Sequence, residues 1–160
     1  MKKIGFLIRV EGLLIVFLIP FIFVSCTTLP QNIESFSRRI VHWDESVPKE
    51  QSVGLFLDQG LNVTLYNGIS VDWPGRTVVY LPPGTVNFVM DVNYHHGNRQ
   101  ISGRDWPFQW AFNAGDRYYL MGYMENNAPV IKVADPNDKT PWYEQASYQV
   151  PLRQGPLILQ

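Results

Sequence analysis

Apolar residues recur at every second position from Val53 onward, and this period constrains the fold more than any other feature of the chain. The first set is Val53, Leu55 and Leu57, and the cleanest set runs from Val86 to Val92. Successive side chains of a strand point to opposite faces, so this period is typical of strands with one buried face. After position 52, no stretch of eleven residues has the 3.6-residue period of an amphipathic helix. The sequence therefore predicts an all-β fold.

Turn residues separate these segments. Asn67-Gly68 is the strongest hairpin signal, because a type I′ turn needs positive φ at both central residues. Pro82-Pro83-Gly84 and Asn113–Asp116 mark further turns. We expect strands at 53–57, 61–66, 69–73, 77–81, 86–92, 109–112, 117–124 and 130–133. Short strands at this spacing favour a sandwich or a barrel, and we predict a single antiparallel β-sandwich of about seven strands over residues 53–135. Residues 136–160 contain Pro151 and Pro156, which predict an extended tail or an edge strand.

The N-terminus has the pattern of a targeting segment. Lys2 and Lys3 precede thirteen uncharged residues, Gly12 to Val24. This length fits the apolar core of a secretory signal and is short for a bilayer span. Ser25, a small residue suited to cleavage, stands before Cys26, the one cysteine of the chain. Residues 1–25 are therefore predicted to be a cleaved signal peptide.

The stretch FVSC, Phe23 to Cys26, resembles a relaxed bacterial lipobox of the spirochaete type. The resemblance implies a cell-envelope lipoprotein, palmitoylated and anchored to a membrane through Cys26, with the inner and outer membranes both open. The alternatives are a plain signal peptide with a chance cysteine and an uncleaved anchor. Residues 26–52 are interpreted as a lipidated N-terminal tether. Within it we expect a first strand at 40–43, with a short helix over 31–39 as the alternative.

The net charge of the chain and the distribution of its basic residues indicate which class of partner it can bind. Removing residues 1–25 would take away Lys2, Lys3, Arg9 and Glu11, so 13 basic and 14 acidic residues would become 10 and 13, a net charge of -3. A nucleic-acid partner requires a clustered basic surface, and the basic residues here are scattered. We therefore expect no nucleic-acid partner.

Part of the domain resembles a known family. The stretch LYNGISVDWPGRTVVYLPPGTVNFVMDV, residues 65–92, is similar to small β-sandwich domains of the PEGA type. FNAGDRYYL, residues 112–120, resembles a strand entry of uncharacterised bacterial lipoproteins. The resemblance covers about residues 53–133 and implies a sandwich fold in an envelope setting. It lends no catalytic residue.

The residues that could carry chemistry lack a supporting context. Ser70 misses the second glycine of a nucleophile elbow. His95 and His96 are adjacent, so on a strand they would point to opposite faces, and we interpret them as part of a hairpin loop. Asp135 and Asp138 lack the spacing of a calcium loop. We therefore predict no catalytic residue, no metal and no cofactor; paired carboxylates of a hydrolase remain a distant alternative.

Three tryptophans stand beside proline: Trp73, Trp106 and Trp142. Such rings either plug the ends of a sandwich or form a stacking surface for a ligand. We favour packing for Trp73 and Trp106, and Trp142 is the better ligand candidate because it lies in the irregular tail. The function expected is a non-catalytic structural or interaction module whose partner is another envelope protein or a glycan. The alternative is a glycan- or peptide-binding module that uses these aromatic residues.

Overall fold

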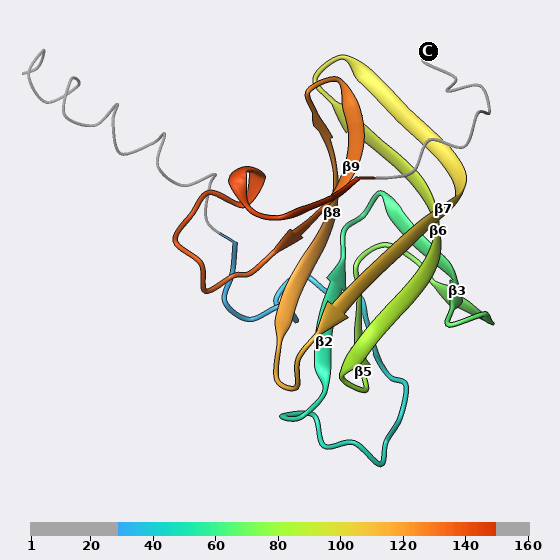
Figure 1. Cartoon of the computed structure of the whole chain (residues 1–160), viewed down its shortest axis with the longest axis vertical. Helices are drawn as coiled ribbons and strands as arrows, with labels where there is room; N and C mark the ends of the chain where they lie inside the picture. Colours follow the sequence, from blue (N-terminus) through green and yellow to red (C-terminus); the bar gives the residue numbers. More distant parts are fainter. Residues whose placement is uncertain (1–28, 150–160) are drawn as a thin grey trace, which may run out of the picture.

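The computed structural model describes residues 29–149, and this part of the chain is all-β, as predicted (Figure 1). Cys26 and the predicted signal peptide lie outside it. The strands pack as two sheets face to face, and a short 3₁₀ turn, η1, follows β9. The elements are β1 (Arg39–His42), β2 (Val53–Leu57), β3 (Leu61–Tyr66), β4 (Ile69–Trp73), β5 (Thr77–Leu81), β6 (Gly84–His96), β7 (Arg99–Phe112), β8 (Arg117–Glu125), β9 (Ala128–Ala134), η1 (Trp142–Glu144) and β10 (Ser147–Gln149).

Two details of the predicted sandwich are wrong. The described residues form ten strands instead of about seven, in sheets of the order β1-β5-β2-β8-β9-β10 and β4-β3-β6-β7. The six-stranded sheet is mixed, because β1 pairs with β5 and β2 pairs with β8 in parallel. Alternation indicates where a strand is but not which strand lies beside it, so the parallel pairs could not be read from the pattern.

The four-stranded sheet is built from hairpins. Asn67 and Gly68 have φ values of 48° and 81°, which confirms the predicted turn between β3 and β4. The β6–β7 hairpin turns at Gly97-Asn98, where His96 pairs with Arg99. This hairpin is longer than predicted and is interrupted by a register shift between Met90 and Val92.

Trp106 and Pro107 lie outside the strand that we expected at 109–112, but in the structure they lie inside β7. They follow Asp105, whose φ is 56°. β7 is an edge strand, where a proline without an N–H can be accommodated. The irregular backbone before Trp106 therefore belongs to a long strand and does not end it.

The main core fills the space between the sheets. Its largest fully buried side chains include Phe88, Phe108, Leu55 and Met90. The strands β2 and β5, however, are buried on both faces. Something must therefore cover the outer face of the six-stranded sheet, and two segments do so.

The first covering segment is the N-terminal strap, which we define as residues 29–38. Ile33, 3% exposed, packs on the outer face beside Phe56 and Tyr119. The backbone N–H of Arg38 then donates to the Arg76 carbonyl at 2.7 Å, and the chain enters β1. From Leu29 onward, the segment interpreted as a tether is thus packed on the domain and includes the strand expected near 40–43. The helix expected over 31–39 is wrong: these residues form turns and bends before β1.

The second covering segment is the C-terminal loop, residues 135–146. Lys132 on β9 is fully buried, and its ammonium donates to Glu125 Oε1 at 3.0 Å and to the Gln145 carbonyl at 3.1 Å. Ser147 Oγ donates to the other oxygen of Glu125 at 2.7 Å. These bonds hold the loop against the sheet and lead the chain into β10, which pairs with β9 at the sheet edge.

Candidate functional site

The outer face of the six-stranded sheet gathers the features that can carry a function. A second apolar cluster lies there, formed by Ile33, Phe56, Val78, Tyr80, Tyr119 and Ala134. Leu29, Met121 and Trp142 pack at its margin. In Figure 1 the first described residues, in blue, lie beside the red C-terminal loop, so the two covering segments meet over this face.

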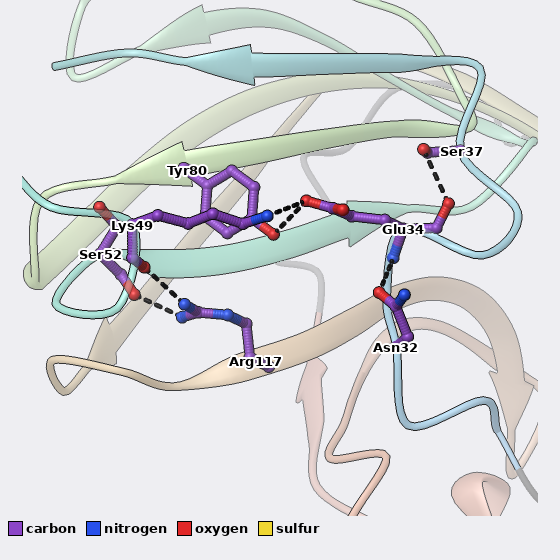
Figure 2. Close-up of polar contacts among 7 residues, drawn as sticks. All are labelled: Asn32, Glu34, Ser37, Lys49, Ser52, Tyr80 and Arg117. Carbon is purple, nitrogen blue, oxygen red and sulfur yellow. Dashed lines mark hydrogen bonds and ion pairs between the residues drawn. The ribbon is translucent and has the colours of Figure 1, made fainter. Parts of the chain in front are cut away.

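A polar cluster of Glu34, Lys49, Tyr80 and Arg117 joins the strap to the sheet (Figure 2). One carboxylate oxygen of Glu34 accepts from Lys49 Nζ at 2.6 Å and from the Tyr80 hydroxyl at 2.7 Å. The hydrogen bonds from Lys49 and then from Tyr80 lower the pKa of Glu34. Burial, reinforced by the bond to Glu34, raises the pKa of Tyr80. Both shifts move these groups away from neutral pH, where a general acid or base would have to titrate. These hydrogen bonds hold the N-terminal strap against the sheet.

Arg117 fastens the loop that follows β1. Its guanidinium donates to the carbonyls of Ser52 and Lys49, as Figure 2 shows. It also lies over the Tyr80 ring, 5.2 Å from the centroid, while His42 stacks on this ring at 4.8 Å. The arginine thus satisfies carbonyls of a loop that belongs to no sheet.

Two cavities adjoin Leu29. The first, the apolar cavity, has a volume of about 250 Å³ and is lined by Leu29, Pro30, Phe36, Phe56, Asp58, Gln59, Arg76, Tyr119 and Met121. Burial raises the pKa of the Asp58 carboxyl. Such a shift in a cleft is a recognised property of functional carboxylates, although it also occurs in purely structural positions.

The second, the Trp142 cavity, has a volume of about 330 Å³ and lies between the strap and the C-terminal loop. Polar side chains line most of it: Gln31, Asp135, Asn137, Asp138, Lys139, Thr140 and Gln145, beside Leu29 and Trp142. Asp135 and Asp138 each accept a backbone N–H two residues ahead, at 2.7 and 2.8 Å. These are the Asx turns expected beside proline, and the bonds from Thr140 lower the pKa of Asp138.

The three predicted tryptophans lie apart from one another. Trp73 and Trp106 are 3% and 8% exposed and belong to the main core. Only Trp142 is half-buried, with its ring 5.3 Å from that of Tyr123 in an edge-on contact. Trp43, which no sequence pattern indicated, is 36% exposed and packs edge-on against Trp73 at 5.5 Å. The proposed stacking surface therefore reduces to Trp142.

The remaining candidates lie away from this face or outside the described residues. His95 and His96 end β6 at the hairpin tip, and His96 helps line a cavity of about 450 Å³ with residues of the β8–β9 turn. Ser70 lies within β4. No group of three or more histidine, cysteine, aspartate or glutamate side chains arranged to hold a metal is found within residues 29–149.

The lipidation candidate, Cys26, precedes the described part of the chain by three residues. Between positions 29 and 149, no helix has both the length and the apolar character needed to cross a bilayer. No family model, curated protein or solved structure matches the chain. The lipobox and PEGA resemblances stay predictions.

No sequence pattern predicted the polar cluster. Glu34 and Tyr80 are separated by 46 positions and Lys49 lies in a loop, so no local spacing could have indicated that they meet. The one available signal was Tyr80 itself, a polar aromatic residue within an apolar strand.

Proposed function

We propose that this chain is a lipid-anchored cell-envelope protein that acts as a structural or interaction module, with Cys26 as the lipidated residue. One observation carries the proposal. The apolar run that ends at Ser25-Cys26 stands three residues before Leu29, which packs on the outer face between two cavities. The anchor and the candidate binding face would therefore be neighbours.

The short segment between Cys26 and Leu29 limits how far the domain can lie from the membrane. Three residues span at most ~11 Å when fully extended. The modification implied by the lipobox resemblance carries three acyl chains, and two or more chains are enough for stable anchoring. Because the strap is packed on the sheet from Leu29 onward, the domain would be held near the membrane surface. The domain would therefore have to bind its partner close to the membrane surface.

Metabolic labelling with an alkyne-tagged fatty acid in a bacterial host tests the anchor. Wild-type protein should be labelled and shortened, while Cys26→Ser should remain unlabelled and uncut because the acceptor thiol is missing. Ser25→Ala is the matched control, since it keeps a small residue at the cleavage site and should be processed normally. Equal labelling of Cys26→Ser and wild type would refute lipidation at this position.

Binding of a glycan or a peptide in the Trp142 cavity is the second candidate function. It is favoured by a half-buried indole beside acidic and amide side chains, the combination that recognises polar ligands with apolar faces. Soluble peptidoglycan fragments should raise the melting temperature of wild-type protein, because a ligand bound only to the folded state stabilises it. Trp142→Ala should abolish this rise. Fragments that leave the wild-type melting temperature unchanged at millimolar concentration would speak against the cavity as a site for them.

A further inference from the structure

The strap and the adjoining strand expose two large apolar side chains. Phe36 is 55% exposed and Ile40 is 47% exposed. Phe56 pairs in register with Val78, and Val78 pairs with Ile40, so these three form a row across β2, β5 and β1. Phe36 precedes β1 and lines the apolar cavity together with Phe56 and Arg76. Phe56 and Val78 are buried, whereas Ile40, on the edge strand β1, is exposed.

Two arginines accompany these residues. Arg38 is exposed, and its backbone N–H is bonded to the Arg76 carbonyl. Arg76 Nε donates to the Phe36 carbonyl at 3.2 Å. Of the nearby carboxylates, Glu34 is already paired with Lys49, and Asp58 lines the apolar cavity together with Arg76. We name Phe36, Arg38, Ile40 and Arg76 the strap patch.

The position of the strap patch relative to the anchor decides what can cover it. Leu29 shares the apolar cavity with Phe36 and Arg76. With at most ~11 Å of chain between Leu29 and Cys26, an acylated Cys26 would bring this side of the domain to the membrane. Side chains such as Phe and Ile then enter the boundary between headgroups and acyl chains, and arginines bind anionic headgroups.

We infer that the strap patch is a membrane-docking surface, with Phe36 and Ile40 inserted into the interface and Arg38 and Arg76 on anionic headgroups. The inference rests on the proposed lipid anchor at Cys26. It adds an orientation: the outer face of the six-stranded sheet lies toward the bilayer, and the four-stranded sheet faces away from it.

Single-cysteine labelling of the full chain tests this orientation. Cys26 is the only native cysteine, and the lipid would consume its thiol, so an introduced cysteine would be the only reactive one. Phe36→Cys is compared with Ile69→Cys on β4, whose native side chain is similarly exposed, at 53%. Both variants carry an environment-sensitive fluorophore and are reconstituted into vesicles of phosphatidylethanolamine and phosphatidylglycerol that contain a doxyl-lipid quencher.

The emission of the label at position 36 should shift to shorter wavelength, and the quencher should remove at least half of its intensity. The emission intensity of the label at position 69 should change by less than a tenth. Arg38→Gln should reduce the dependence of quenching on phosphatidylglycerol. Arg104→Gln, an exposed arginine on β7, should not. Equal quenching at positions 36 and 69, or none at either, would overturn the inference.

The mass of the peptide that contains Cys26 separates this inference from the proposed function. A lipidated peptide with no quenching at position 36 refutes the docking and leaves the anchor intact. An unmodified peptide refutes the anchor, and the docking inference falls with it. Quenching of position 36 that disappears when a soluble partner protein is added would assign the patch to that protein and would also contradict stable docking.

Discussion

Replacing Glu34 tests whether the polar cluster fastens the strap to the sheet. Glu34→Ala removes the acceptor of the Tyr80 hydroxyl and of the Lys49 ammonium. Tyr80 is 3% exposed, so its hydroxyl loses a charge-assisted bond of ~1.5–3 kcal/mol in a buried setting. The Lys49 side chain is 44% exposed, and an exposed ion pair adds only ~0–1 kcal/mol. We expect a total loss of ~2–3 kcal/mol in the free energy of unfolding, a large part of the ~5–15 kcal/mol that stabilises a domain.

Urea unfolding and a double-mutant cycle measure this loss. With a slope of ~1–3 kcal/mol per molar urea, the midpoint of Glu34→Ala should fall by ~0.7–3 M. Tyr80→Phe removes only the donor, and its coupling to Glu34→Ala should reach ~1 kcal/mol or more. Lys49→Met should couple more weakly. If the Glu34 and Tyr80 substitutions add within ~0.3 kcal/mol, they do not interact, and the fastening role is refuted.

The pH dependence gives an independent check. The pKa of Glu34 is lowered in the folded state. Its stabilising effect is therefore fully present above the unfolded pKa of ~4.3 and is lost as the pH falls through the lower folded value. The stability difference between wild type and Glu34→Gln should be constant near pH 7 and shrink below about pH 4. If the strap opens before the sheets unfold, the Arg38 amide should begin to exchange its hydrogen faster at a higher pH than the amides within the sheets do.

Two further predictions concern the sandwich itself. Trp73→Ala should lose ~3–5 kcal/mol, because Trp73 is buried among aromatic rings, whereas the half-buried Trp142→Ala should lose clearly less; similar thermal melting of both variants would contradict the burial argument. Gly68→Val should lose ~1–2 kcal/mol through backbone strain alone, because its φ is 81° and no atom lies within 4 Å of the added Cβ; a urea midpoint equal to that of wild type would show that the turn relaxes without cost.

Local sequence determined the strands and the hairpin turns. The alternation of Val53, Leu55 and Leu57 places three side chains in the core, and Asn67-Gly68 makes the predicted turn. Both signals depend only on side-chain direction and on φ within a few residues. They therefore survive in any tertiary arrangement that offers a buried face.

Tertiary structure alone decided the partners of these strands and the covering of the outer face. Nothing near β2 in the sequence indicates that it lies parallel to β8, or that Ile33 covers Phe56 on the face opposite the core. Glu34 meets Tyr80 only because the strap folds back over the sheet. Contacts between residues far apart in sequence depend on how whole strands stack, and a period of two is the same for every strand. The sequence thus indicated where the strands are, while the candidate site arose where distant segments meet.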